Sequence, residues 1–324
     1  MNQQPLRRRG FLPTLTDEEV ITMEICGEYF GFSQEEDLYN YFSAHYAHFF
    51  PALRGRTSFV RQSANLWKMK ALIQERLTYV RGEAHDPVQI IDTMPLPVCT
   101  YTRARRDRCF PCAADFGYCA AKDMHYYGFK LGLRVSRVGM IIHYPLLSAR
   151  PHDSQFLDDL LDGFEGVAPA DKGFVDAFRQ TELARKRHVE LVTPARKNMK
   201  VQPPVAVRLI CRRWRKPVET VASHLTERFH IAIAVQKSFF RMSLRGTKQS
   251  PTLQGDFLGG RTPPRNDIEM RLERTYLEIY KTRAHDLWHY QNRLIRKVLA
   301  HTVCVFLNLQ LGRPPLDLDG LVTA

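Results

Sequence analysis

The alternation of apolar and polar positions divides the chain into a helical first part and a mixed second part. Residues 16–81 repeat apolar positions at helical spacing. The sequences TDEE from Thr16 and SQEE from Ser33 have the form of capping boxes and predict two helix starts. A third helix is predicted over 58–80. We therefore expect residues 1–85 to form a small all-helical N-terminal domain.

The third predicted helix carries basic residues between its apolar positions. Three short helices with a basic third member resemble a helix-turn-helix module, whose second helix enters the DNA major groove. The alternative is a three-helix cap with a solvated basic face, and no distinctive turn sequence decides between them. The basic residues are Arg61, Lys68, Lys70 and Arg76.

From residue 86 the pattern changes to strands. The sequence PVQIIDTMPLPVC, residues 87–99, predicts a buried β-branched strand. Pro95 and Pro97 lack backbone donors, so we expect the strand to end near Asp92. Asp92 on its own is typical of a turn or capping aspartate, and a catalytic role requires partners.

Strands and helices alternate after Asp92. A hairpin is predicted over 126–148, with its turn at Arg137 and Val138, and a helix over 152–164 with Asp153 as N-cap. The next strand ends at Asp171, and a helix over 174–187 and a strand over 189–194 follow. This order predicts a mixed sheet with helices packed on it.

The following predicted helix, 216–230, has Pro217 in its first turn. Glu219 lies on a face adjacent to its apolar stripe. Residues 243–267 are rich in Gly, Pro, Ser and Thr and read as irregular, and helical patterning resumes near Ile268. The apolar stripe consists of Val218, Val221, Leu225 and Phe229.

The charge balance favours a polyanionic partner. The 324 residues include 47 Lys and Arg against 34 Asp and Glu, a formal charge of +13. Nucleic acid is the leading candidate, because no basic amphipathic helix of the membrane-surface kind is evident. Neither a signal peptide nor a membrane span is predicted, and seven cysteines suit a reducing compartment, so we expect a cytoplasmic protein.

Three carboxylates, Asp92, Asp171 and Glu219, come from distant parts of the predicted α/β region. Gathered without a cation, they would repel one another and raise each other's pKa values. Oxygen ligands select hard ions such as Mg²⁺ or Mn²⁺. Two such ions could clamp the attacking and leaving oxygens of a phosphoryl transfer. Together with the positive charge, this predicts chemistry on DNA or RNA.

Five sequence blocks carry a resemblance to a known family. They are IIDTMPLPVC, HYYGFKLGLRVSRVGMIIHYPLLSARPHD, PADKGFVD, VELVTPARKNMK and RKPVETVASHLTERF. In order and length these resemble the DDE transposases of bacterial insertion sequences, and most closely insertion-sequence family 982. The resemblance covers most of residues 10–236 and 281–322.

The resemblance implies an RNase H-like fold for residues 86–235, completed by C-terminal helices over 281–324. It places Asp92, Asp171 and Glu219 at the family's positions for binding two Mg²⁺ or Mn²⁺ ions. It further implies an enzyme that binds terminal inverted repeats of double-stranded DNA, cleaves the element's ends and transfers the freed 3′-hydroxyl to target DNA. A homodimer holding two ends, at the bacterial nucleoid and away from membranes, is expected on the same basis.

Several basic residues are candidate DNA contacts. Arg215 matches the basic residue that related transposases place four positions before the glutamate, where it could contact a DNA phosphate. The basic residue expected seven positions after the glutamate falls on Thr226, which is a departure, and Arg228 is near but out of register. Further candidates for contacts with the DNA backbone are Lys130, Lys172, Arg196 and Lys197.

A segment of about 45 residues, 236–280, interrupts the resemblance. Its sequences RGTKQSP and PRND resemble translated copies of short bacterial genomic repeats, and we interpret it as an insertion. Loop length costs little entropy, so the fold could tolerate a surface insertion. One alternative is a catalytically inactive relative that only binds DNA. A second alternative is another RNase H-like nuclease or resolvase.

A zinc site is a further hypothesis. Cys109 and Cys112 form a CxxC pair, with Cys99 and Cys119 nearby. Tetrahedral zinc requires four ligands, and paired CxxC sequences are the strong form of the signal. One pair with two single cysteines is weak, and buried or loop thiols are the alternative. A non-enzymatic zinc regulator is the corresponding function.

Overall fold

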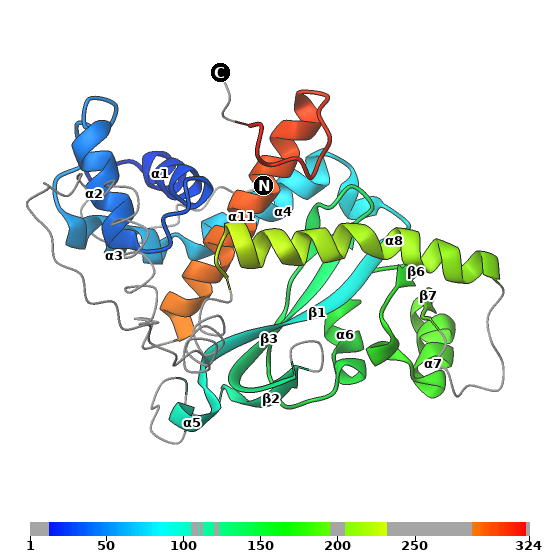
Figure 1. The fold of residues 1–324 in the computed structure, drawn as a ribbon. Helices are drawn as coiled ribbons and strands as arrows, with labels where there is room; N and C mark the ends of the chain where they lie inside the picture. The colour runs from blue at the N-terminus through cyan, green and yellow to red at the C-terminus, as the bar shows by residue number, and fades with distance from the viewer. Residues whose placement is uncertain are drawn as a thin grey trace, which may run out of the picture.

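The computed structural model describes residues 13–104, 110, 113–119, 123–194, 205–231 and 287–321. They form a mixed α/β structure with a mostly antiparallel sheet and helices packed on it (Figure 1). Arg196, Lys197, Cys109, Cys112 and the segment 236–280 lie outside the described residues. Within the described part, no helix is both long and apolar enough to cross a membrane.

The first helices are α1 (Asp17–Tyr29), α2 (Glu35–His45), α3 (Arg56–Asn65) and α4 (Trp67–Val80). The predicted capping box at Thr16 is confirmed. The Thr16 hydroxyl accepts from the Glu19 amide, and the Glu19 carboxylate accepts from the Thr16 amide at 2.7 Å. These two bonds satisfy backbone donors that the first turn of a helix leaves without partners.

Two predictions in this region are wrong. The N-cap of α2 is Gln34 rather than Ser33, and its side chain makes no capping hydrogen bond. The Ser33 carbonyl instead accepts from Arg296 at 3.1 Å. The single helix predicted over 58–80 is two helices, because Leu66 leaves helical geometry where its side chain enters the core with Phe59.

The larger sheet is built around β3 (Met124–Ser136), with β1 (Gln89–Thr100) on one edge and β2 (Asp115–Cys119) on the other. The strands β4 (Ile141–His143) and β5 (Leu146–Ser148) also pair antiparallel with β3, which confirms the predicted hairpin. The short helices η1 (Glu83–His85) and α5 (Tyr101–Ala104) lie at the two ends of β1.

A second sheet pairs β6 (Gly166–Pro169) with β7 (Val189–Val192) in parallel, and a bridge from Val88 to Val167 joins it to the start of β1. Around it lie η3 (Asp153–Phe156), α6 (Leu157–Leu160), η4 (Lys172–Phe174) and α7 (Ala177–Arg187). Asp153 was expected to be an N-cap, but His152 takes that role by accepting from the Ser154 amide.

The two prolines led us to expect that β1 ends near Asp92, and this prediction is wrong. The strand continues through Pro95 and Pro97, which lie opposite Lys130 and Gly128 of β3. The backbone groups of residues two apart point to the same edge of a strand. Beyond Val88, only the β3 edge of β1 is paired within the described residues. An edge strand tolerates proline because its open side needs no ladder donor.

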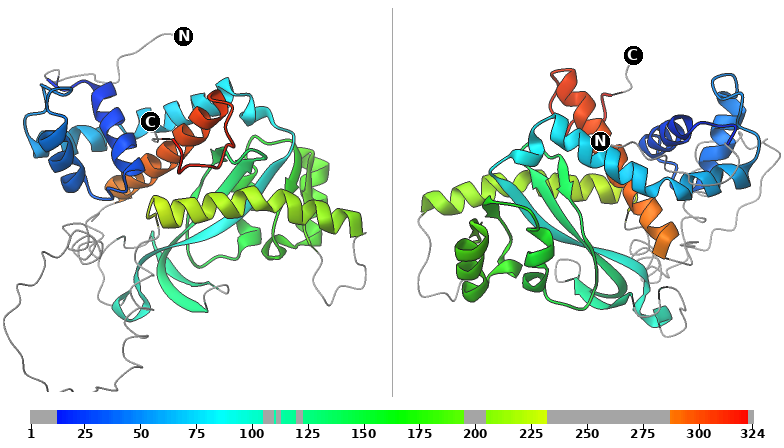
Figure 2. Two further views of the ribbon diagram at one scale, coloured as in Figure 1. Left: turned by 45° about the horizontal axis from the view of Figure 1, so that its top comes forward. Right: turned by 180° about the vertical axis from the view of Figure 1, so that it is seen from behind.

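Helix α8 (Val205–Ser223) crosses the sheet and continues into a π-helical turn, η5 (His224–Arg228) (Figures 1 and 2). The predicted start at 216 is wrong, because Pro217 lies inside this helix rather than in its first turn. The predicted core stripe is confirmed. Its members Val218, Val221, Leu225 and Phe229 are all buried.

The two faces of β1 enter different cores. Ile90, Met94 and Leu96 pack with the stripe of α8, whereas Ile91 packs with α6 and α7. Successive side chains of a strand alternate between its faces. Asp92 has the parity of Ile90 and Met94, so its side chain lies on the α8 face of the sheet.

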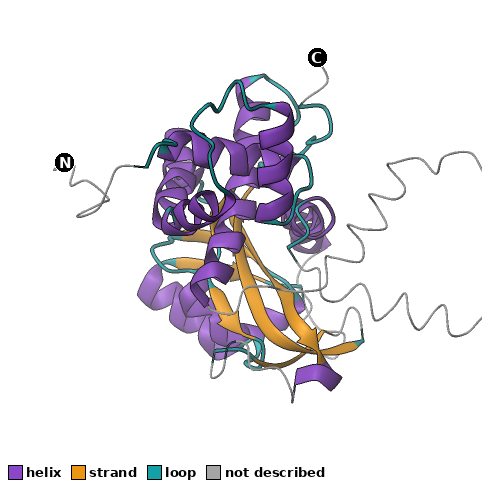
Figure 3. Ribbon diagram, turned by 90° about the vertical axis from the view of Figure 1, so that its left-hand side faces the viewer, coloured by secondary structure: helices purple, strands orange, loops and turns teal. Residues whose placement is uncertain are grey.

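Helix α11 (Leu287–Gln310) joins the N-terminal helices to the sheet. It packs against α4, α1, α3 and η5, and in Figure 3 these helices gather on one side of the strands. Leu299 belongs to the core of the N-terminal helices, whereas Val298 and Val305 belong to the core beneath α8. The division into domains at residues 85 and 281 remains a prediction.

We expect His301 of α11 to make the stability of the fold sensitive to acid. It is fully buried, neither ring nitrogen has a hydrogen-bond partner in the described structure, and the His224 ring lies 5.6 Å away. Burial, with a smaller effect of the His224 charge, lowers the pKa of His301 from 6.5 to about 3. As the pH falls, the His301 ring is therefore protonated in the unfolded chain before it is protonated in the folded protein. The stability that is present above the ordinary pKa of 6.5 is lost as the pH falls below 6.5.

Because of His301, we expect the free energy of unfolding to fall by about 2 kcal/mol when the pH is lowered from 7 to 5. Urea unfolding at the two pH values measures this loss. The variant His301→Leu should show a correspondingly smaller loss, because it has no proton to take up. An equal loss in both proteins would contradict the assignment.

Candidate active site

The three predicted carboxylates come from three different elements. Asp92 lies within β1, opposite Leu133 of β3. Asp171 follows β6 and precedes η4, and Glu219 lies in α8. Glu219 and Asp171 are about half exposed, at 56% and 45% of the side chain, whereas Asp92 is more buried.

Arg215 links these elements. One guanidinium nitrogen lies 3.1 Å from an Asp171 oxygen, and the other terminal nitrogen lies 3.3 Å from a Glu219 oxygen. Helical spacing explains the second contact, because residues four apart on α8 lie on one face. The first contact depends on the fold, since it brings α8 against the end of β6. Asp171 and Glu219 therefore flank a single cation.

Asp92 lies within electrostatic reach of the same group. The pKa of Asp92 is raised to about 6, mainly by burial and in smaller part by the negative charges of Asp171 and Asp153. The Thr93 amide, which donates to the Asp92 carboxylate at 2.8 Å, and the Arg215 charge act in the opposite direction. The structure thus places Asp92 within electrostatic reach of Asp171 and Arg215, and Arg215 in contact with both Asp171 and Glu219.

Asp153 is a residue of this site that sequence reasoning assigned only to a helix cap. Its carboxylate pairs with Lys130 of β3 at 3.0 Å, and Lys130 also donates to the Pro151 carbonyl at 2.9 Å. Gly173 lies against Asp153, where an added Cβ would be 2.9 Å from a carboxylate oxygen. Asp153 therefore packs the turn after β5 against the segment that carries Asp171. A sequence signal for this role is absent, because it depends on tertiary contacts.

The predicted DNA contacts differ in their surroundings. Lys130 is largely buried and engaged with Asp153, so its ammonium group is not presented to solvent as an exposed lysine would be. Lys172 is exposed at the start of η4. Arg228 pairs with Asp319 and lies 4.5 Å from the centre of the Tyr29 ring. Thr226 donates to the Ala222 carbonyl within the helix.

The basic face expected on the third helix is divided. Arg61, Lys68 and Arg76 are exposed, on α3 and α4. Lys70 is fully buried, and its ammonium group lies 2.5 Å from a Glu24 oxygen. Lys70 is therefore part of the packing between helices and is not available for a nucleic acid.

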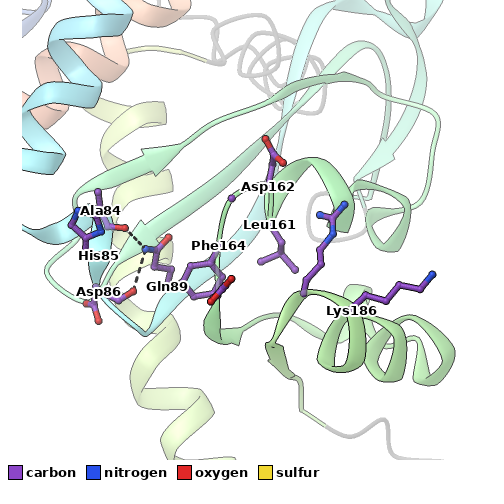
Figure 4. A pocket seen from close by; sticks show the side chains of 11 residues that line it. Ala84, His85, Asp86, Gln89, Leu161, Asp162, Phe164 and Lys186 are labelled. Atoms are coloured by element: carbon purple, nitrogen blue, oxygen red, sulfur yellow. Dashed lines mark hydrogen bonds between the residues drawn. The ribbon is translucent and has the colours of Figure 1, made fainter. Parts of the chain in front are cut away.

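A cavity of roughly 600 Å³ lies at the start of β1, away from the carboxylates (Figure 4). Gln89, which donates to the Ala84 and Asp86 carbonyls, lines it together with Lys186 and Arg187. None of Asp92, Asp171 and Glu219 lines it. The charged chemistry lies on the α8 face of the sheet, so we place the candidate site there rather than in this cavity.

The donor set suits a hard divalent cation, because all three candidate ligands are carboxylates. The present arrangement does not yet form a binding site. Among the described residues, no three Asp, Glu, His or Cys side chains are gathered in metal-binding geometry. The guanidinium of Arg215 contacts both Asp171 and Glu219, two of the three candidate ligands.

Comparison with known proteins supports a transposase. Residues 82–238 match the family model described as a transposase DDE domain. The matched segment contains Asp92, Asp171, Arg215 and Glu219, and the mixed α/β structure is consistent with a domain of this RNase H-like kind. Domains of this family generally use divalent metal ions. No curated protein and no solved structure gave a significant match.

Proposed function

We propose that this protein is a DNA transposase of an insertion sequence, related to family 982, which cleaves the element's ends and joins the freed 3′-hydroxyl to target DNA. The contacts of Arg215 with Asp171 and Glu219, with Asp92 within electrostatic reach, on a segment that matches the transposase DDE domain, support the proposal. The formal charge of +13 supports a polyanionic substrate.

The roles proposed for the residues follow from their chemistry. Asp92, Asp171 and Glu219 would hold one or two Mg²⁺ or Mn²⁺ ions, which would stabilise charge on the reacting phosphate when bound. Arg215 and Lys172 would contact phosphates, as would Arg196 and Lys197 outside the described residues. Lys130 would act by orienting Asp153. Exposed Arg61, Lys68 and Arg76 would support binding of the terminal repeats by the N-terminal helices.

The reaction has two balanced steps. In the first, water attacks the phosphodiester at the element's end, and the bridging 3′-oxygen leaves as the 3′-hydroxyl. In the second, that hydroxyl attacks a phosphodiester of the target, its proton passes to solvent, and the target's own 3′-oxygen leaves. Each step exchanges one phosphorus–oxygen bond for another, so neither requires an oxidant or a covalent enzyme intermediate.

The test is cleavage and joining of a labelled duplex that carries the terminal repeat of the element, together with unlabelled target DNA. We expect cleavage in Mg²⁺ or Mn²⁺ and none in EDTA, with labelled 3′ ends joined to the target. Metal-dependent cleavage of branched or unrelated DNA without joining would instead identify a nuclease or resolvase. Specific binding of the repeat with no cleavage would identify an inactive relative.

A homodimer that holds two DNA ends is also proposed, in the bacterial cytoplasm at the nucleoid. Light scattering of the protein with and without the terminal-repeat duplex measures the number of chains in each complex. The hypothesis of zinc bound by Cys99, Cys109, Cys112 and Cys119 remains a prediction, and stoichiometric zinc without nuclease activity would favour a regulator.

A further inference from the structure

Arg215 contacts two of the three carboxylates of the candidate site. Its two terminal nitrogens pair with Asp171 and Glu219, and its charge lowers the pKa of Asp92 against the effect of burial. One guanidinium therefore offsets part of the negative charge of the carboxylates that a divalent ion would bind. The repulsion expected of clustered carboxylates is relieved in part by the protein itself.

Both ion pairs of Arg215 are open to an exchange of partners. Asp171 and Glu219 are 45% and 56% exposed, so each ion pair is partly screened by water. The Nε–H of Arg215 is buried and has no hydrogen-bond partner in the described structure. An arginine presents its donors as a planar fork that matches phosphate oxygens. A phosphate could therefore satisfy the unused donor in addition to replacing the two carboxylates.

We propose that Arg215 is an electrostatic latch, which pairs with Asp171 and Glu219 in the free protein and releases them for divalent metal when a DNA phosphodiester takes its guanidinium. This inference rests on the proposed function. It assigns Arg215 two successive partners, carboxylates before DNA binding and phosphate after it. Metal binding and DNA binding then strengthen one another, because coupling between two ligands is reciprocal.

The latch would confine a charged, reactive site to the DNA complex. A free protein whose carboxylates are occupied by Arg215 has weak affinity for Mg²⁺ or Mn²⁺. Helix α8 carries both Arg215 and Glu219, so movement of the arginine side chain frees Glu219 without movement of the helix. The same displacement frees Asp171, which lies on a different element.

The experiment measures Mn²⁺ binding by electron paramagnetic resonance, first without DNA and then with a saturating duplex. Wild type is compared with Arg215→Gln, which keeps a polar side chain but removes the charge. Arg213→Gln is the matched control, because Arg213 is an exposed arginine one half-turn away on α8. Circular dichroism checks that each variant keeps the wild-type secondary structure.

Without DNA, we expect Arg215→Gln to bind Mn²⁺ about tenfold more tightly than wild type. Arg213→Gln should bind as wild type does. Addition of the duplex should tighten Mn²⁺ binding more in wild type than in Arg215→Gln, because the variant has no latch to release. Equal affinities of Arg215→Gln and wild type, or an equal gain in the control, would overturn the latch.

The metal site itself is tested separately by Asp92→Asn. Mn²⁺ binding that is lost in Asp92→Asn but unchanged in Arg215→Gln refutes the latch and leaves the proposed transposase site standing. Mn²⁺ binding of unchanged affinity in Asp92→Asn shows that the Asp92 charge does not contribute to it, and that result refutes the proposed site together with its latch. The two failures are thus distinguishable in one set of titrations.

Discussion

Replacement of Asp92 by asparagine is expected to lower metal-dependent DNA cleavage by about 10³-fold or more. Asparagine preserves the shape of the side chain and an oxygen ligand, but it removes the charge. Asp92 is the most buried of the three carboxylates, and its pairing within β1 fixes its backbone opposite Leu133 of β3. Cleavage of the terminal-repeat duplex under single-turnover conditions measures the effect.

The same substitution is expected to stabilise the metal-free protein at neutral pH. The pKa of Asp92 rises from 3.8 to about 6 on folding, mainly because of burial. A raised carboxyl pKa contributes stability below the unfolded value, and this is lost as the pH rises through the folded value. Ionised Asp92 therefore destabilises the fold at pH 8, and Asp92→Asn should gain about 1–2 kcal/mol there after allowance for partial exposure.

Measurement of both cleavage and stability in Asp92→Asn separates a chemical defect from a folding defect. Urea unfolding at pH 8 should place Asp92→Asn above wild type in stability while its cleavage is lost. Glu227→Gln is the control, because Glu227 is an exposed carboxylate on η5 and should keep both activity and stability. Full cleavage by Asp92→Asn would refute its catalytic role, whereas lost stability would show that its charge supports the fold.

The sequence predicted most elements between residues 86 and 230 because hydrophobic period decides them. Its errors fall where tertiary contacts compete with local preference. Pro95 and Pro97 do not stop β1, because beyond Val88 the described residues pair only the β3 edge of this strand, and an edge strand tolerates proline. Pro217 lies inside α8 because its neighbours Val218 and Val221 bury a continuous stripe against the sheet.

The candidate site was predictable in part. The positions of Asp92, Asp171 and Glu219 followed from the resemblance, and helical spacing alone places Arg215 beside Glu219. The second contact of Arg215, to Asp171, depends on how α8 crosses the end of β6, which no local pattern encodes. The pairing of Lys130 with Asp153 was missed for the same reason.

The largest set of contacts that sequence pattern did not predict is a buried ionic network between α11 and the N-terminal helices. Charged residues are usually exposed, so Glu24, Glu28 and Arg296 give no sequence signal of burial, yet each side chain is 1% exposed. Arg296 pairs with Glu28 and lies 3.7 Å from Glu24 and 3.5 Å from Glu35. Lys297 also pairs with Glu28, at 2.8 Å.

The electrostatics of the network favour the charged forms of Glu35 and Arg296. Burial raises the pKa of Glu35, but Arg296 and Arg293 more than offset this, and the pKa falls to about 2. Burial likewise lowers the pKa of Arg296, and the surrounding glutamates reverse that effect. Removal of one partner from such a network leaves buried charge without compensation.

Arg296→Met is therefore expected to lower the free energy of unfolding by about 3–5 kcal/mol. Methionine retains much of the apolar stem, so the loss reports the guanidinium rather than a cavity. Urea unfolding followed by circular dichroism measures it. Arg56→Met is the matched control, because Arg56 pairs with Glu36 at the surface, where an ion pair contributes about 1 kcal/mol or less.

The outcome bears on the segment 236–280, because α11 follows it in sequence and packs on α1, α3 and α4. A large loss in Arg296→Met alone would show that α11 docks on α1 through these charges, so that the two ends of the chain form one cooperative unit. Equal small losses in both variants would show that α11 contributes little to the folding of the N-terminal helices. In that case, retention of cleavage in a chain without α11 would become the decisive comparison for the role of the C-terminal segment.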